Sequence, residues 1–171
     1  MDWSKAKTIV IIALLVTNLV LGGFLMFDHL QAVNTEKQAA QSAAEYLSAH
    51  GIALNCELPA TVTKLPVLFV DFEEGTGEKT LSYNGYLLQV TDAGELVPVT
   101  LEPGDVKSPV CGASSAVIKA VMQESGIRSI ENVSLVYHVD RSGYSDAGED
   151  TAFPSWRVQT DLGPFYIEAL Q

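Results

Sequence analysis

Residues 155–170 read SWRVQTDLGPFYIEAL and have the pattern of a β-hairpin. Apolar residues alternate with polar ones on both sides of Thr160–Gly163, and Thr-Asp-x-Gly is common turn chemistry. Residues 87–99, LLQVTDAGELVPV, carry the same four-residue pattern at Thr91–Gly94 between two apolar segments. The sequence therefore predicts two hairpins, about 70 residues apart.

Each predicted hairpin follows a helix and an earlier strand. In the first half, a helix begins at a capping box at 35–38 and stops at Gly51, and an apolar strand follows at 65–72. In the second half, a helix with an apolar face begins at 114 and stops at Gly126, and a strand follows at 132–139.

The order helix, strand, strand, strand thus occurs twice. We predict an α+β fold built from two tandem repeats, residues 28–105 and 106–171. Residues 83–86, Tyr-Asn-Gly-Tyr, fit either a turn or a continuous strand. Pro98 favours an edge position for its strand. Residues 101–108 are expected to form a connector and residues 141–152 a solvent-exposed loop.

Residues 8–27 form an uncharged apolar run near the N-terminus. A helix of this length spans about 30 Å, the thickness of the hydrocarbon layer of a bilayer. The run is too long for a typical cleaved signal peptide, although Gly22 and Gly23 resemble the small residues of a cleavage site. Lys5 and Lys7 precede the run, and positive charge marks the cytoplasmic side.

The sequence therefore predicts a single-pass protein of the cell membrane. Residues 1–7 form a cytoplasmic stub, residues 8–27 a transmembrane helix, and residues 28–171 the extracytoplasmic portion. That last portion holds 8 Lys and Arg against 20 Asp and Glu, a net charge of −12. A nucleic-acid partner requires the opposite sign, so that class of partner is excluded.

A polar and small face lies within the predicted span. Asn18 and Gly22 are one helical turn apart, and Ala13 and Thr17 form a second small pair. Asn in hydrocarbon gains from a hydrogen-bonding partner, and Gly permits close approach of another helix. We expect these four residues to bind a membrane-embedded partner helix; the alternative is that one Asn is tolerated at modest cost.

Cys56 and Cys111 are the only cysteines. Outside the cytoplasm they would be able to form one disulfide, and the alternative is two separate buried thiols. Neither belongs to a CxxC motif or a Cys/His cluster, so a zinc site and thioredoxin-like chemistry are not expected.

The sequence predicts no catalytic, cofactor-binding or metal-binding residues. His29, His50 and His138 have no partner at a ligand spacing such as HExxH. Residues 112–116, Gly-Ala-Ser-Ser-Ala, resemble a nucleophile elbow only in part, and Ser114 or Ser115 as a helix N-cap explains the same residues more simply.

Two acidic segments, residues 71–78 and 140–150, carry carboxylates of the kind that calcium binds. Serine and tyrosine occupy the third and fifth positions of the second segment, where an EF-hand loop requires acidic or amide side chains. Both segments are therefore interpreted as solvated surface.

Both ends of the chain are similar to one family. The opening MDWSKAKTI, which leads directly into the apolar run, resembles the start of the YycI regulators of the YycH/YycI family, bitopic proteins of Gram-positive bacteria. Residues 154–158, PSWRV, and 165–169, FYIEA, resemble that family's closing P-x-W-R hairpin and Y-I-x-A strand, of which the strand is shared with PepSY-like domains. The middle matches only in element order, and the chain is shorter than is usual for the family.

The resemblance implies a non-enzymatic regulatory function. Members regulate an essential cell-envelope two-component system by contacting its sensor histidine kinase, of the WalK/YycG type, together with a YycH-like paralogue. No catalytic residue carries over from the family, and the shorter chain puts the partner surfaces in doubt. The alternative function is a PepSY-like binding module, tethered to the membrane, that contacts a wall component or a protease.

Overall fold

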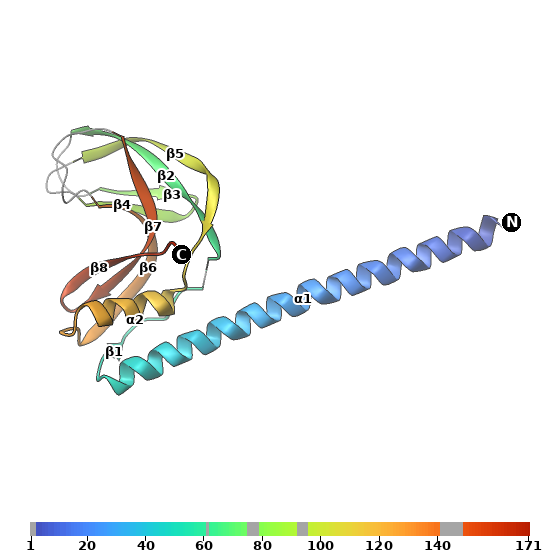
Figure 1. Ribbon diagram of the computed structural model, residues 1–171, viewed down its shortest axis with the longest axis horizontal. Helices are drawn as coiled ribbons and strands as arrows, with labels where there is room; N and C mark the ends of the chain where they lie inside the picture. The colour runs from blue at the N-terminus through green and yellow to red at the C-terminus, as the bar shows by residue number, and fades with distance from the viewer. Residues whose placement is uncertain (1–2, 61, 75–78, 92–95, 141–148) are drawn as a thin grey trace. The chain divides into compact units, whose positions relative to one another are not determined.

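The fold is α+β, as expected from the sequence. The computed structural model describes residues 3–60, 62–74, 79–91, 96–140 and 149–171 (Figure 1). In chain order the elements are α1 (Trp3–Ala49), β1 (Ala53–Leu54), β2 (Lys64–Glu74), β3 (Lys79–Tyr83), β4 (Tyr86–Thr91), β5 (Leu96–Pro109), α2 (Ala113–Gln123), β6 (Ser129–Asp140), β7 (Glu149–Thr160) and β8 (Gly163–Glu168).

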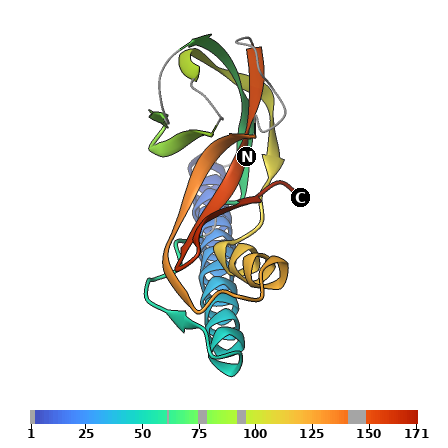
Figure 2. The same cartoon turned by 90° about the vertical axis from the view of Figure 1, so that its left-hand side faces the viewer.

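The described strands form one curled sheet. Their order is β3-β4-β6-β7-β2-β5, with β1 beside β6 and β8 beside β7. The pairs β4–β6 and β1–β6 are parallel, and the other pairs are antiparallel. The first residues of β7 pair with β2 and its later residues pair with β8 (Figure 2). This long strand therefore connects the part of the sheet that contains β2 and β5 to the part that contains β8.

Two apolar clusters lie along the sheet. The larger one joins the end of α1, helix α2 and the strands β6, β7 and β8 around the fully buried Trp156. The smaller one joins β2, β4, β6 and β7 around the fully buried Tyr137. Trp156 also donates its indole N–H to the carbonyl of Cys111 at 2.8 Å, which fixes the segment before α2 against the centre of β7.

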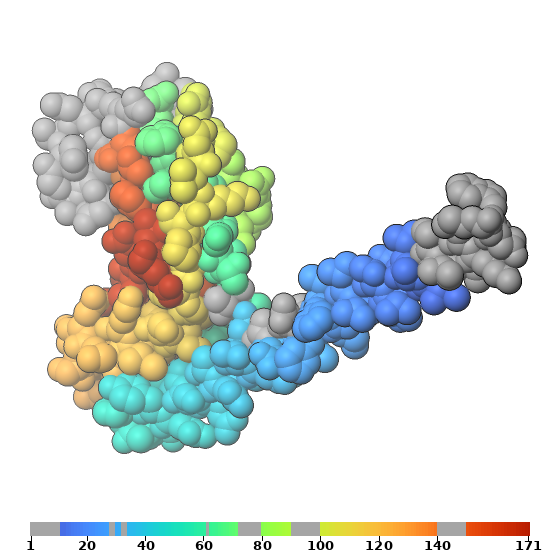
Figure 3. Space-filling view, turned by 45° about the vertical axis from the view of Figure 1, so that its right-hand side comes forward, coloured from blue at the N-terminus to red at the C-terminus, as the bar shows by residue number. Residues whose placement is uncertain are grey.

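Helix α2 packs on this sheet through the face that its sequence period predicts. Ala116, Val117, Ala120 and Val121 are buried, as expected. The last turns of α1 lie beside α2 (Figure 3) and bury Leu47 in the same cluster.

Helix α1 is continuous from Trp3 to Ala49, so the predicted start of a separate helix at residues 35–38 is wrong. The Thr35 hydroxyl donates to the carbonyl of Gln31 at 2.9 Å, a bond typical of a residue inside a helix. The predicted stop is confirmed, because Gly51 has a φ of +73°. The Gly51 N–H donates to the Ser48 carbonyl, and the Ile52 N–H donates to the Leu47 carbonyl. These two hydrogen bonds form the Schellman motif of a helix C-terminus.

The first predicted hairpin, residues 87–99, is wrong. Strand β4 pairs with β3 and β6, whereas β5 pairs with β2, and residues 92–95 of the expected turn lie outside the described residues. The hairpin instead turns at Asn84-Gly85, whose φ angles of 48° and 84° suit a type I′ turn. An apolar strand can pair with any partner of compatible register, so adjacency in sequence was misleading here.

The second hairpin is confirmed. Strands β7 and β8 pair antiparallel across Asp161 and Leu162. Thr160 fastens this turn, because its hydroxyl donates to the Gly163 carbonyl at 2.9 Å and accepts from the Leu162 N–H at 3.1 Å.

Three smaller expectations need correction. Residues 101–108 are part of strand β5 rather than a connector, and β5 is an edge strand of the described sheet, as Pro98 indicated. Residues 149–152 of the expected loop belong to β7, and residues 141–148 lie outside the described residues. The N-cap of α2 is Gly112, so Ser114 and Ser115 do not have that role.

The chain forms two compact units, residues 1–38 and 39–171. Within the second unit, strands from the two proposed repeats interleave: β6 pairs with β4, and β7 pairs with β2. The order α2, β6, β7, β8 matches the predicted helix, strand, strand, strand of residues 106–171.

Candidate functional site

The apolar run in α1 exposes its side chains in the isolated chain. Every residue from 11 to 27 is exposed, and Leu19 reaches 73%. The predicted span also includes residues 8–10, whose side chains lie outside the described ones. Among the described residues, no helix combines the length and the apolar character that crossing a membrane requires.

The four residues of the predicted partner face differ in what they offer. The Thr17 hydroxyl donates to the carbonyl of Ala13 at 2.9 Å, so this pair presents its methyl groups. A Cβ added at Gly22 would meet no atom within 4 Å, so the helix backbone is accessible there. Asn18 is exposed and lies one turn before Gly22, so its amide is available to an approaching helix.

A second candidate surface lies on the face of the sheet opposite the two apolar clusters, where Val136, Gln89 and Ser155 are buried among more exposed neighbours. Strand side chains alternate between the faces, and on β7 the core face carries Trp156 and Val158. The opposite face, here named the open face, carries the alternate residues of five strands. They are Thr80, Ser82, Leu87, Gln89, Asn132, Ser134, Val136, His138, Phe153, Ser155, Arg157, Gln159, Pro164, Tyr166 and Glu168.

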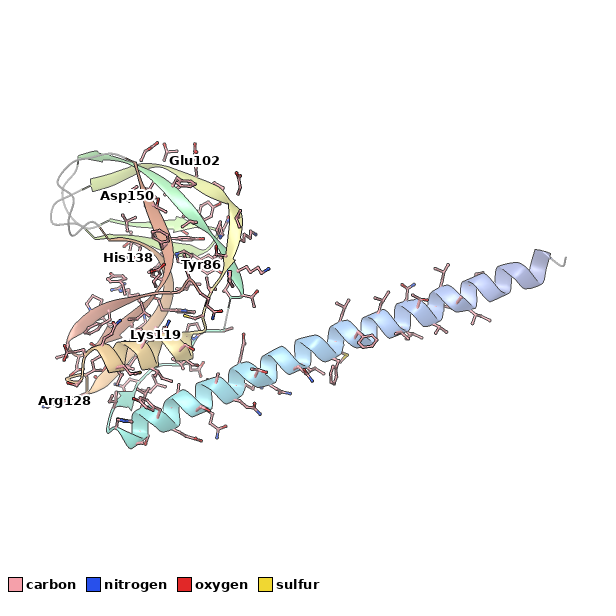
Figure 4. All side chains as sticks on the ribbon, viewed as in Figure 1. Tyr86, Glu102, Lys119, Arg128, His138 and Asp150 are labelled. Atoms are coloured by element: carbon pink, nitrogen blue, oxygen red, sulfur yellow. The ribbon has the colours of Figure 1, made fainter. Side chains whose placement is uncertain are left out.

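A depression of about 240 Å³ lies on the open face, lined by His138, Phe153, Ser155, Tyr166 and Glu168. Strands β6, β7 and β8 bring these residues together through register, since His138 is opposite Phe153, and Ser155 is opposite Glu168. The rings of His138, labelled in Figure 4, and Tyr166 stack at 4.1 Å with an angle of 11°. Phe153 is 39% exposed, so the depression offers apolar ring surface.

A buried amide links this depression to strands β3 and β4. Gln89 is only 3% exposed, and its Nε2 donates to the Thr80 hydroxyl at 2.8 Å. The Tyr166 hydroxyl donates to Gln89 Oε1 at 3.4 Å. These bonds satisfy both ends of the amide and hold the Tyr166 ring in place beside the depression.

Arg157 extends the open face beyond the depression. It follows Ser155 by two residues on β7 and lies opposite Tyr166 on β8. Its Nη2 makes a long contact of 3.4 Å to Gln159 Oε1, and its buried Nε has no hydrogen-bond partner among the described residues. No described carboxylate is ion-paired with this guanidinium.

The sequence did not identify these open-face residues as a site. His138 falls in the strand predicted at residues 132–139, and it is partly buried within β6. Arg157 and Tyr166 lie in the two segments that resemble the YycH/YycI family, and the sequence predicts no site role for either. The available signal was the alternation along residues 153–159, which places Arg157 on the face opposite Trp156.

Ser155 does not have the environment of an activated nucleophile. It is 3% exposed, and its hydroxyl donates to the carbonyl of Phe153 at 3.2 Å. Nucleophilic serine instead requires a hydrogen bond to a general base. The groups that the open face offers to solvent are aromatic rings, a carboxylate and a guanidinium, which are suited to binding.

The candidate metal ligands of the sequence do not form a site among the described residues. In the described part of the chain, no group of three or more His, Cys, Asp or Glu side chains is arranged to hold a metal ion. The acidic segments 71–78 and 140–150 lie partly outside the described residues.

Both cysteines are free thiols. Cys111 is buried in the larger cluster, with its N–H donating to the Ala169 carbonyl at 2.7 Å. Burial raises the pKa of the half-buried Cys56 thiol, and the carboxylate of Glu131 raises it further against a hydrogen bond from Val133. The raised pKa of Cys56 and the burial of Cys111 are typical of structural thiols. A disulfide between them on oxidation stays a prediction.

No model of a protein family matches the chain, and no curated protein matches it.

Proposed function

We propose that this chain is a non-enzymatic, single-pass membrane regulator of a sensor histidine kinase that controls the cell envelope. The observation that carries the proposal is the exposed apolar run of α1, with Asn18 and an accessible Gly22 on one face. The resemblance of both ends of the chain to the YycH/YycI family supplies the class of partner, a kinase of the WalK/YycG type, together with a YycH-like paralogue.

In this proposal residues 8–27 cross the membrane and residues 1–7 stay in the cytoplasm, because Lys5 and Lys7 precede the run. The remaining residues lie outside the cytoplasm. They consist of two PepSY-like repeats, 28–105 and 106–171, and the order α2, β6, β7, β8 supports the second of them.

The anchor acts by helix packing. Within lipid, association depends on close backbone approach and on hydrogen bonds between helices, since lipid tails are as apolar as leucine. A kinase helix packed on Asn18 and Gly22 shifts the kinase between its states by the difference in affinity for those states. Ala13 and Thr17 extend the same small surface through their methyl groups.

Co-purification from solubilised membranes tests the proposal. The full-length protein and a version with residues 8–27 replaced by an unrelated apolar span are each used to capture the host kinase. We expect capture by the native protein and loss with the replaced span. Asn18→Leu, which keeps the span apolar, is expected to weaken capture severalfold and to alter kinase output. Ile12→Ala, on the opposite face of the span, is the matched control and should leave capture unchanged.

Equal capture by both spans would refute a role for the anchor and move recognition to the extracytoplasmic unit. Capture by neither would favour the second candidate function, a tethered PepSY-like binding module that contacts a wall component or a protease. The open face, with its depression beside His138, favours this second candidate.

A further inference from the structure

Arg157 is the feature of the open face that the fold itself does not explain. Its guanidinium is partly buried in the middle of the sheet, between Tyr166 on β8 and Ser134 on β6. A guanidinium has five N–H donors, and the described residues satisfy one of them, at 3.4 Å. A partly buried charge with so few partners gains strongly from an anion that accepts from its Nη groups.

We propose that the open face binds an extended peptide segment of a partner protein, whose Asp or Glu carboxylate pairs with Arg157 and whose aromatic side chain enters the adjacent depression. This inference does not depend on the membrane anchor and is separate from the proposed kinase contact.

The distance between Arg157 and the depression favours an extended peptide as the ligand. Arg157 and Ser155, at the wall of the depression, are two residues apart on one face of β7, which is about 6.6 Å. Side chains two residues apart on an extended peptide have the same separation and direction. A segment lying along β7 with the pattern aromatic-x-acidic, or its reverse, therefore reaches both subsites at once.

Two charges of the open face act on an acidic segment in opposite directions. Glu168 lies opposite Ser155 and lines the depression, and it is not ion-paired with Arg157. Its carboxylate opposes an incoming anion, whereas Arg157 attracts it. The two residues are thus expected to change binding in opposite directions.

The probe is a fluorescently labelled, end-blocked peptide, Gly-Ser-Phe-Ser-Glu-Ser-Gly, together with its order-reversed form, titrated with the full-length protein in detergent micelles by fluorescence anisotropy. We expect at least one of the two forms to bind. Replacing its Glu by Gln is expected to weaken binding at least about tenfold, because the charge-assisted pair is lost.

Variants of the protein test the same pair from the other side. Arg157→Gln is expected to weaken binding at least about tenfold, and Arg157→Lys about as much, because the forked geometry is lost. Glu168→Gln is expected to strengthen binding about two- to threefold. Arg128→Gln is the matched control: Arg128 is an exposed arginine before β6, labelled far from His138 in Figure 4, and its loss should leave affinity unchanged.

Because Arg157 is partly buried, thermal unfolding of each variant is measured alongside. If Arg157→Gln fails to fold, the opposite effects of Glu168→Gln and of the Glu-to-Gln peptide decide the question. Peptide affinity that is equal for Glu and Gln, or unchanged by Arg157→Lys, would overturn the proposal. So would Arg157-dependent binding to phosphatidylglycerol vesicles without binding of either peptide, since the anion would then be a lipid.

Discussion

Tyr137 is a fully buried residue whose hydroxyl the surrounding fold leaves without a partner. It is 1% exposed in the smaller cluster, and its hydroxyl has no hydrogen-bond partner among the described residues. The rings of Tyr83 and Tyr86 meet its ring edge-on, at 6.1 and 6.5 Å. Edge-on aromatic contacts stabilise the ring, while the unpaired hydroxyl costs about 1–3 kcal/mol.

We therefore predict that Tyr137→Phe raises the free energy of unfolding by about 1 kcal/mol, as measured by denaturant unfolding. Burial, followed by the nearby Tyr83 and Tyr86, raises the pKa of Tyr137 to about 12. The folded state thus favours the neutral phenol. Its contribution is complete below about pH 10, the ordinary pKa, and is lost as the pH rises toward 12.

The phenylalanine variant should lack this alkaline loss. Tyr46→Phe serves as the control, because Tyr46 is half-buried near the end of α1 and its ring contacts that of His50 at 4.2 Å. A Tyr137→Phe variant less stable than the native protein by 1 kcal/mol or more would mean that the hydroxyl has a partner, such as an ordered water.

Among the elements, the β7–β8 hairpin is connected to the start of β6 by one exposed carboxylate. Asp161 Oδ1 accepts from the backbone N–H of Arg128 at 3.0 Å and of Ser129 at 3.2 Å. These two hydrogen bonds, with Arg128 first, lower the pKa of Asp161 below its ordinary value. The turn residue therefore also caps a neighbouring strand.

We predict that Asp161→Asn reduces the acid sensitivity of this hairpin. The depressed pKa means that the carboxylate contributes stability above the ordinary pKa of about 3.8, and that this contribution disappears as the pH falls through the folded value. The protection factors of the Arg128 and Ser129 amides, which correct the exchange rate for the pH dependence of the unprotected amide, should fall in the native protein between pH 6 and 3 and change little in the variant, as measured by NMR. An equal fall in both would contradict the prediction.

The elements differ in how far their sequence determines them. Helix α2 and the β7–β8 hairpin were predicted because their signals are local: a period of 3.6 in Ala116–Val121, and turn chemistry at 160–163. The prediction of a hairpin at 87–99 was wrong because distant residues decide which strands pair. Strand β4 pairs with residues about fifty positions away on β6, which no local pattern encodes.

At the scale of the whole molecule, the same difference explains why the candidate site was only partly predictable. The anchor face of Asn18 and Gly22 follows from one helix and was predicted from spacing alone. The open face required β6, β7 and β8 in register, and the orphan Nε of Arg157 depends on what its neighbours fail to supply. Alternation along β7 predicts which side Arg157 occupies, and nothing in the sequence predicts its missing partner.

The division into two units leads to a prediction about folding. Residues 39–171 form one compact unit, and the part of α1 within it buries Ala43 and Leu47 completely. Both apolar clusters lie in this unit. We therefore expect a fragment of residues 39–171 to be well folded without the apolar run, with a single cooperative thermal transition by circular dichroism.

The end of α1 should be essential to that fragment. Removing a buried leucine costs about 2–5 kcal/mol, so Leu47→Ala in residues 39–171 is expected to lower the midpoint of unfolding by at least about 10 °C. Ser48→Ala, an exposed neighbour on the same turn, is the matched control and should shift it little. A fragment that unfolds without cooperativity would instead mean that residues 1–38 contribute to the fold of the second unit.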